Sequence, residues 1–259
     1  MALLTKSKFY FGVSVESENN ILDLDEGTGS FPVTLAVKAY APSEIATALS
    51  SALNSAGTLS YTVSLNRTTR LLKITASGAF SIRRATGPNS ASNIYSVLGF
   101  PGGTDLTGLS QYDGTVGVGF EFEPQFYLLD YVPLDHNVKS VKASVNETGS
   151  GAVEVIRFGT KRYMECSIDF ISDRKFIGDD IWSSNTNGIA DALKFMNYAI
   201  EKSTMEFMPN RLDVANYTKL ILESTESDSQ GTGFKLLEML DYGEGLYRTG
   251  RLVFREVSS

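Results

Sequence analysis

The chain has 259 residues, of which 42% are hydrophobic and 11% aromatic, and its formal net charge at pH 7 is −7. This length suffices for one large all-β domain or two domains of ordinary size, and the apolar content excludes a disordered chain. The 23 basic residues are outnumbered by 30 acidic ones and form no cluster, which argues against direct nucleic-acid binding.

The N-terminal residues lack the features of a secretory signal. Lys6 and Lys8 interrupt the apolar run, and residues 9–13 have the pattern of a β-strand. No window approaches the roughly 20 consecutive apolar residues that a membrane-spanning helix needs. We therefore expect a protein that does not associate with membranes and that is made and folded in a cytoplasm.

The first strand pair is expected to join residues 9–15 with residues 31–38. The connection between them is acidic and contains glycine at residues 23–29. Asp23 and Asp25 have the Asp-x-Asp spacing of a calcium loop, but the other ligands of an EF-hand loop are missing. We favour a solvated turn over a calcium site.

A helix and a hairpin come next. Pro42 in a first-turn position and Glu44 after it predict a helix start, because the missing N–H of proline costs nothing there. Its apolar stripe is formed by residues 45, 49, 52 and 53, and the helix ends at residues 54–57. Two alternating strands at 61–65 and 72–76 predict a hairpin with a polar loop at 66–70. A turn at Ser77 and Gly78, a short strand at 80–82 and a helical turn near 92–98 complete this region.

The segment 101–117 is rich in glycine and proline, which indicates either a linker or an ordered connection. We place a domain boundary there, so that an N-terminal α+β module covers residues 1–113 and a second domain covers residues 114–259.

The second domain is predicted to be mainly strands with one helix. The helix spans 187–202, with Ile189, Leu193, Met196 and Ile200 on one stripe and Ala192 and Ala199 beside it. Polar loops are expected at 144–151 and 224–233. The strands are expected near 118–122, 125–131, 138–145, 152–158, 163–171, 204–209, 217–222, 234–238 and 247–255. The predicted fold class is α+β, mainly β: a small N-terminal α+β module followed by an antiparallel β-sandwich or split barrel with one flanking helix.

Few residues are candidates for catalysis or metal binding. The single cysteine, Cys166, lies on the apolar face of an alternating strand, which predicts a core residue and excludes an internal disulfide. The single histidine, His136, lies in a polar turn, so a zinc site or a histidine-dependent triad lacks ligands or partners. Glu121 and Glu123 share a strand face, which fits a solvated surface at least as well as a catalytic carboxylate pair. We predict no enzymatic activity, no catalytic residues, no cofactor and no metal.

The order of elements in residues 31–100 resembles a module found in structural proteins of tailed-bacteriophage virions. The resemblance rests on the segments 40–45 (YAPSEI), 52–54 (ALN), 61–63 (YTV) and 98–100 (LGF). In the second domain, residues 205–209 (MEFMP) and 250–255 (GRLVFR) look like distal tail or tail-tube proteins, which form rings around the DNA conduit. This resemblance implies a virion tail or baseplate component assembled in the host cytoplasm.

The partners implied by the resemblance are other copies of the chain, in a homo-oligomeric ring that is most often a hexamer, and other tail or baseplate proteins. DNA would pass through the lumen without specific binding. Two alternatives stay open. One is a receptor- or glycan-binding module on the virion surface, with Trp182 as its best aromatic candidate, and the other is a carboxylate-pair hydrolase.

Overall fold

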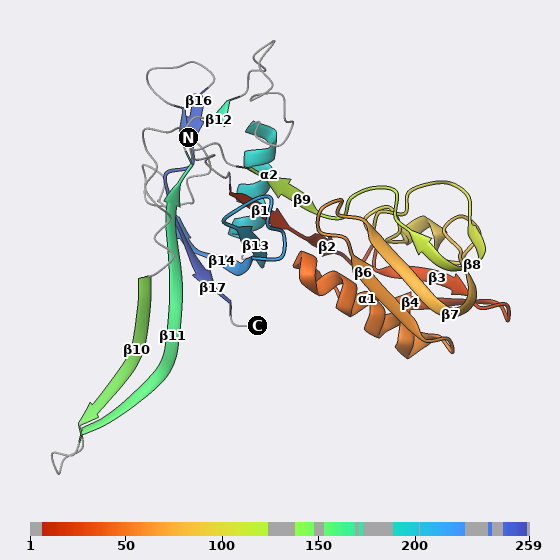
Figure 1. The fold of residues 1–259 in the computed structure, drawn as a ribbon, viewed down its shortest axis with the longest axis horizontal. Coiled ribbons are helices and arrows are strands. Elements are labelled where there is room, and N and C mark those ends of the chain that lie inside the picture. Colours follow the sequence, from red (N-terminus) through yellow and green to blue (C-terminus); the bar gives the residue numbers. More distant parts are fainter. Residues whose placement is uncertain are drawn as a thin grey trace. The chain divides into compact units, whose positions relative to one another are not determined.

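The structure is a computed structural model that describes residues 7–123, 138–147, 153–168, 171–172, 189–201, 203–225, 238–239 and 246–257. It is mainly β, with 44% strand and 16% helix, and its sheets are antiparallel (Figure 1). The predicted α+β, mainly β class is therefore confirmed. The described strands do not close into a barrel.

The chain divides into two compact units. The N-terminal unit consists of Phe9–Glu121 and Thr204–Tyr217, and the C-terminal unit consists of Met1–Lys8, Phe122–Ser203 and Thr218–Ser259. The N-terminal unit thus runs past residue 113, where the sequence indicated a boundary, and takes in a segment from late in the chain. The two units are connected by four crossings of the chain rather than by a single linker.

The N-terminal unit is built around one long central strand, β7 (Figure 1). Its main sheet has the order β4-β3-β7-β6, and β8 pairs with β7 on the side away from β6. A separate pair is formed by β2 and β5, and β1 lies between β13 and β9. The strands are β1 (Lys8–Phe11), β2 (Val13–Val15), β3 (Ile21–Asp25), β4 (Ser30–Thr34), β5 (Lys38–Tyr40), β6 (Tyr61–Leu65), β7 (Leu72–Ile82), β8 (Leu106–Asp113), β9 (Phe120–Phe122) and β13 (Met205–Met208).

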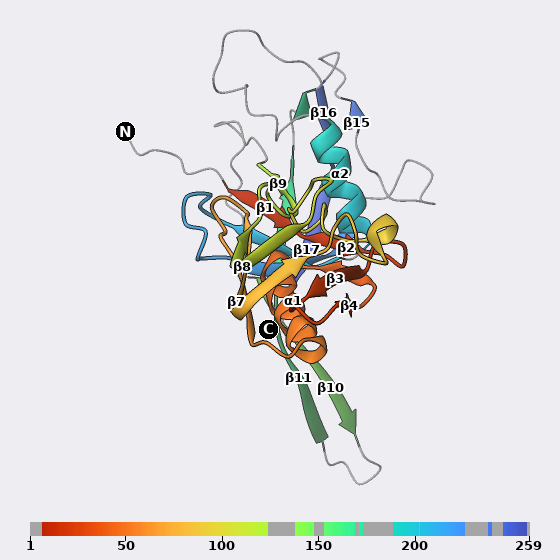
Figure 2. The same ribbon diagram turned by 90° about the vertical axis from the view of Figure 1, so that its right-hand side faces the viewer.

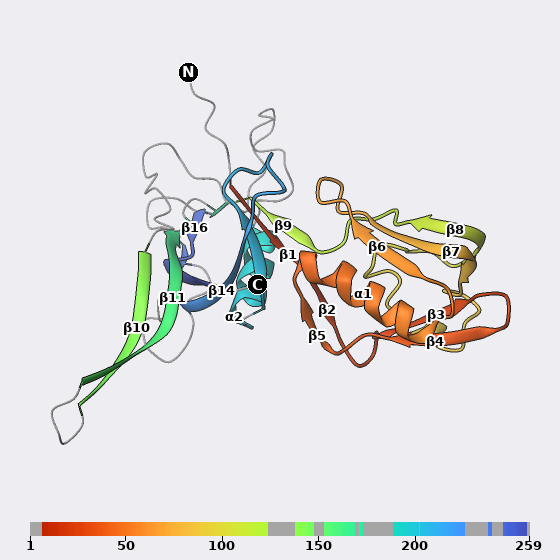
Figure 3. The same ribbon diagram turned by 60° about the horizontal axis from the view of Figure 1, so that its bottom comes forward.

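Helix α1 (Pro42–Ala56) confirms the predicted helix and lies against the main sheet (Figure 3). Pro42 opens it, and the Glu44 carboxylate accepts the backbone N–H of Ala41 at 3.3 Å. Ile45, Leu49 and Leu53 are fully buried, as the apolar stripe predicted. The helix ends at Gly57, whose N–H donates to the carbonyl of Leu53 at 2.8 Å.

The first strand pair differs from the prediction. Val15 and Lys38 are opposite one another, but the rest of residues 31–38 does not pair with residues 9–15: β4 pairs with β3, and β2 pairs with β5. The strand breaks at Gly12, where an added Cβ would lie 1.6 Å from the Tyr40 carbonyl oxygen. The sequence reading missed β3 because its two aspartates resemble a turn.

The hairpin of residues 61–76 is confirmed, with Tyr61 opposite Ala76 and Leu65 opposite Leu72. The turn predicted at Ser77 and Gly78 is wrong, because β7 continues through both residues to Ile82. The pairing of β7 with β8 instead shifts register between Thr75 and Phe80. The Tyr112 hydroxyl lies at this irregularity, where it accepts the N–H of Leu109 at 3.0 Å and donates to the Phe80 carbonyl at 2.8 Å. The local break in pattern therefore marks a bulge within one strand.

The glycine-rich segment is not a linker over residues 106–113, because these residues form strand β8. Before it, a 3₁₀ turn (η1, Ser90–Ser92) leads into the predicted helical turn, in which the N–H of Leu98 donates to the Ile94 carbonyl at 3.0 Å. Gly99 ends that turn with a φ of 85°.

The C-terminal unit contains a sheet with the order β10-β11-β17-β14 and a small sheet with the order β12-β16-β15. Helix α2 (Ile189–Ile200) confirms the predicted second helix. Its buried stripe includes Phe195, which the sequence reading had not assigned to it, together with Ala192, Met196 and Ala199, and the Phe195 ring stacks on Phe122 with centroids 4.9 Å apart. The strands are β10 (Val138–Glu147), β11 (Val153–Ser167), β12 (Ile171–Ser172), β14 (Thr218–Thr225), β15 (Glu238–Met239), β16 (Leu246–Arg248) and β17 (Arg251–Glu256).

Strands β10 and β11 form a two-stranded projection, which we call the arm and define as residues 138–147 and 153–162. Strand β11 pairs with β17 only from Tyr163 to Ser167, whereas its earlier residues pair with β10 alone. Figure 2 shows both strands leaving the rest of the C-terminal sheet together. Among the described strands, β10 has a neighbour on one side only.

Candidate functional site

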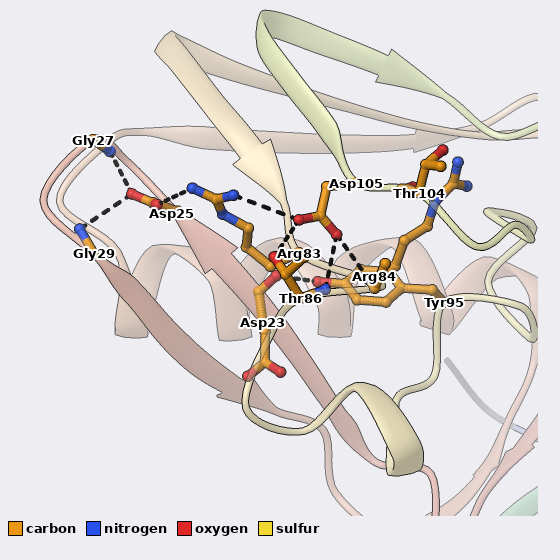
Figure 4. Close-up of polar contacts among 11 residues, drawn as sticks. Asp23, Asp25, Gly27, Gly29, Arg83, Arg84, Thr86, Tyr95, Thr104 and Asp105 are labelled. Carbon is orange, nitrogen blue, oxygen red and sulfur yellow. Dashed lines mark hydrogen bonds and ion pairs between the residues drawn. The ribbon is translucent and has the colours of Figure 1, made fainter.

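The acidic stretch that the sequence singled out lies inside the N-terminal sheet. Asp23 and Asp25 belong to β3, and only the residues after them form the turn. Asp23 is wholly inaccessible to solvent and Asp25 is nearly so. The prediction of a solvated turn is therefore wrong for both aspartates, and the partners that bury them define a polar network (Figure 4).

Asp25 and Asp105 are bridged by Arg83. One guanidinium nitrogen of Arg83 lies 2.6 Å from Asp25 Oδ2 and the other lies 3.4 Å from Asp105 Oδ2. Asp25 Oδ1 also accepts the backbone N–H groups of Gly27 at 2.7 Å and Gly29 at 3.2 Å. The tip of the β3–β4 hairpin is thus tied to the end of β7 through one arginine.

Asp105 fixes the segment that follows β7. Its Oδ1 accepts the N–H groups of Ala85 at 2.8 Å and Thr86 at 3.2 Å, and the Thr86 hydroxyl donates to its Oδ2. The neighbouring Arg84 donates to the backbone carbonyls of Phe100, Pro101 and Thr104. The glycine-rich approach to β8 is therefore held by side chains rather than by a regular element.

Asp23 holds the 3₁₀ turn in place through hydrogen bonds, as Asp105 does for the segment after β7. Its carboxylate accepts the backbone N–H of Asn89 at 2.7 Å and the Asn89 side-chain amide at 2.8 Å. Its backbone carbonyl accepts the hydroxyl of the buried Tyr95. Gly87 packs so closely that an added Cβ would lie 2.5 Å from Asp23 Oδ2.

The electrostatics favour charged aspartates in this network. The hydrogen bond from Arg83 and those from two backbone N–H groups lower the pKa of Asp25. Burial opposes the charged form of Asp105, but the hydrogen bonds from Thr86, Ala85 and Arg83 outweigh it and lower the pKa of that carboxyl. Both groups are therefore anionic at neutral pH and paired with donors.

The network does not resemble a calcium site. Each of the six carboxylate oxygens of Asp23, Asp25 and Asp105 already accepts a hydrogen bond. Within the described parts of the chain, no group of three or more His, Cys, Asp and Glu side chains could hold a metal ion. What the arrangement does chemically is connect backbone segments.

A second polar cluster lies where residues 204–217 join the N-terminal unit. The Glu206 side chain is wholly buried and accepts the N–H of Ser43, at the start of α1, at 2.8 Å. Ala41 precedes the helix and has no side chain that could cap it, so this carboxylate serves as a cap from a distant part of the sequence. Sequence reading missed this role, although a glutamate inside the apolar strand Met205–Met208 was a usable signal.

Arg67 is the charged partner of Glu206. Its guanidinium donates to the Glu206 carboxylate and, through Nε, to the Val214 carbonyl at 2.8 Å. The same group lies over the Tyr217 ring, 4.0 Å from the centroid. The loop of the β6–β7 hairpin thus holds both ends of the late segment.

The other predicted candidates do not join either cluster. Cys166 is partly buried on β11, and burial raises the pKa of its thiol to about 12, which suits the predicted core residue. Glu121 Oε2 lies 4.0 Å from Arg70 Nε. His136 and Trp182 lie outside the described residues, as do parts of the loops 144–151 and 224–233.

No known protein family matches the chain, and no curated protein sequence matches it. None of the helices among the described residues is both long enough and apolar enough to cross a membrane.

Proposed function

We propose that the protein is a structural component of a phage tail or baseplate, which forms a homo-oligomeric ring around the DNA conduit and contacts neighbouring tail proteins. Its place would be the virion tail, assembled in the host cytoplasm. The resemblance of residues 31–100 to virion modules supports a place in a phage particle. The arm of the C-terminal unit supports the formation of a ring from several copies.

The arm is the main structural evidence that copies of the chain assemble. A two-stranded hairpin is marginally stable in water, because it has no sheet or helix on which to bury a face. Before Tyr163, β11 pairs only with β10, and β10 ends the sheet among the described strands. An exposed strand edge of this length invites pairing with another chain, and closed rotational symmetry removes such edges. Contacts between copies would give the arm a partner that the described residues of its own unit do not supply.

The negative net charge of the chain is consistent with a ring through which DNA passes. With a net charge of −7, a ring would repel the phosphates of passing DNA rather than bind them. The two polar clusters of the N-terminal unit connect backbone segments, which is a structural task. We propose no catalytic activity and no cofactor.

Light scattering and negative-stain imaging of the purified chain test this function. We expect closed rings, most often of six copies, at concentrations where subunits meet freely. A chain that stays monomeric at high concentration and that antibodies do not find in tail particles would contradict the proposal. Binding of the monomer to a glycan array would instead favour a receptor-binding module.

A further inference from the structure

The main sheet of the N-terminal unit has three outer edges, and two of them carry devices that discourage strand addition. The edge strand β4 contains Pro32, which has no N–H to offer to a new strand. At the β6 edge, the Asn54 amide of helix α1 takes the place of a neighbouring strand. Its Nδ2 donates to the Tyr61 carbonyl at 2.8 Å, and its Oδ1 accepts the Tyr61 N–H at 2.8 Å.

Strand β8 forms the third edge and has neither a proline nor a side chain that covers its outer edge, although its pairing with β7 shifts register. Residues 107–111 are all exposed, and Leu109 is 58% exposed although it is a large apolar residue. From Leu106 to Tyr112 the strand has neither a charged residue nor a proline. The only charged residue of β8 is Asp113 at its end, which lies 3.6 Å from Lys73 of β7, so the strand before it is open to strand addition.

The distribution of charge along the chain indicates which strand would be added to β8. The arm contains five basic and two acidic residues, a net charge of +3, within a chain whose net charge is −7. The N-terminal unit contains seven basic and eleven acidic residues, a net charge of −4. A positively charged arm, in which β10 has one free edge among the described strands, and an acidic unit with an outer edge on β8 are complementary.

We propose that β8 of one copy receives strand β10 of the arm of a neighbouring copy by strand addition. This inference rests on the proposed ring function and names its interface. The contact joins two different surfaces, so it is head-to-tail, and such contacts generate closed rings when the rotation closes. Backbone hydrogen bonds supply the pairing and the opposite charges supply the choice of partner.

Disulfide trapping between two variants tests the interface. Both variants carry Cys166→Ala; one adds Ser110→Cys in β8, and the other adds Ser144→Cys in β10 together with an affinity tag. Mild oxidation of the mixture should give a covalent heterodimer, whereas each variant alone should give none. Homodimers of the Ser110→Cys variant would mean that β8 pairs with itself, and homodimers of the Ser144→Cys variant would mean that arms pair with each other; either result overturns the proposal.

A charge placed on the edge gives a second test. Thr107→Lys in β8 should reduce the assembled fraction at least tenfold, whereas Thr62→Lys, the same change on the exposed face of β6, should leave it unchanged. If the unmodified chain forms rings but Thr107→Lys also forms them and no heterodimer appears, the β8 interface is wrong and the ring function stands. If the unmodified chain does not assemble, the ring function fails and the interface fails with it.

Discussion

Glu206 and Arg67 lie 139 residues apart in the chain and form an ion pair in which the Glu206 side chain is wholly buried. The same carboxylate caps helix α1 through Ser43. The Glu206 carboxylate therefore pairs with the partly buried guanidinium of Arg67 and also accepts a hydrogen bond from the N-terminus of α1. This unit is completed only when residues 204–217 are in place.

Replacing Glu206 should destabilise the N-terminal unit strongly. Glu206→Gln keeps the shape of the side chain but leaves the partly buried charge of Arg67 without its partner, at a cost of about 3 kcal/mol. Urea unfolding measures this loss, and hydrogen exchange should locate it in the first turn of α1. The matched control is Asp213→Asn in the same segment, where the side chain is exposed and the expected change is within about 0.5 kcal/mol. Equal stability of the two variants would show that the ion pair contributes nothing.

The Asp25–Arg83–Asp105 chain makes stability depend on pH in the acid range. The folded pKa values of Asp25 and Asp105 are lowered, so their contribution is complete above the unfolded pKa of about 3.9 and is lost as the pH falls through the folded values. We expect similar urea midpoints at pH 7 and pH 5 and a clearly lower midpoint at pH 3.

The variant Asp25→Asn isolates one member of this chain. It should unfold at a lower urea concentration than the natural chain at pH 7, and it should lose less stability between pH 5 and pH 3. Parallel pH profiles for the two proteins would exclude Asp25 as a source of the acid sensitivity.

The close packing of Gly87 on Asp23 predicts a steric effect. A Cβ at this position would lie 2.5 Å from the Arg83 carbonyl and 2.6 Å from Asp23 Cβ, so the backbone must shift. We expect Gly87→Ala to lower the free energy of unfolding by about 1–3 kcal/mol. Gly103→Ala serves as the control, because no atom lies within 4 Å of its Cβ. If the unfolding curves of the two variants coincide, the close packing of Gly87 on Asp23 is contradicted.

The Asn54 cap on β6 can be removed without touching the core. Asn54→Ala removes both hydrogen bonds to Tyr61 and should cost about 1–2 kcal/mol. It also uncovers the β6 edge, so light scattering should detect more irregular association than in the natural chain. Ser55→Ala, an exposed change on the same helix, should alter neither quantity.

Cys166 should react slowly with thiol reagents in the folded protein. Burial raises its pKa to about 12, so almost none of it is thiolate at pH 8. A chromogenic disulfide should therefore modify it far more slowly than it modifies the chain in urea. Equal rates in the two conditions would show that the β11 strand leaves the thiol accessible.

The spacing of apolar residues was sufficient to predict secondary structure wherever a segment determines its own conformation. The proline at the start of α1, its apolar stripe at helical spacing and the alternating hairpin around residues 66–70 are local signals, and the structure confirms each of them. Helix α2 was predicted for the same reason, although Phe195 was not assigned to its buried stripe.

The spacing of apolar residues did not predict which strands pair with one another. Asp23 and Asp25 have the composition of a turn, and only donors on Arg83 and Asn89, about sixty residues away, allow them to lie in a buried strand. Strand β8 was hidden by glycines, because its hydrogen bonds are made to β7 rather than within the segment.

The sequence by itself determined the mainly β class, the two helices and the central hairpin, because these follow from local conformational preference and from the spacing of apolar residues. Only the tertiary structure decided which strands are neighbours, which aspartates are buried and that residues 204–217 belong to the N-terminal unit. Those outcomes depend on charges and hydrogen-bond donors that meet across long stretches of chain. Glu206 is the clearest case, since its strand alone predicts neither the helix that it caps nor the arginine that it pairs with.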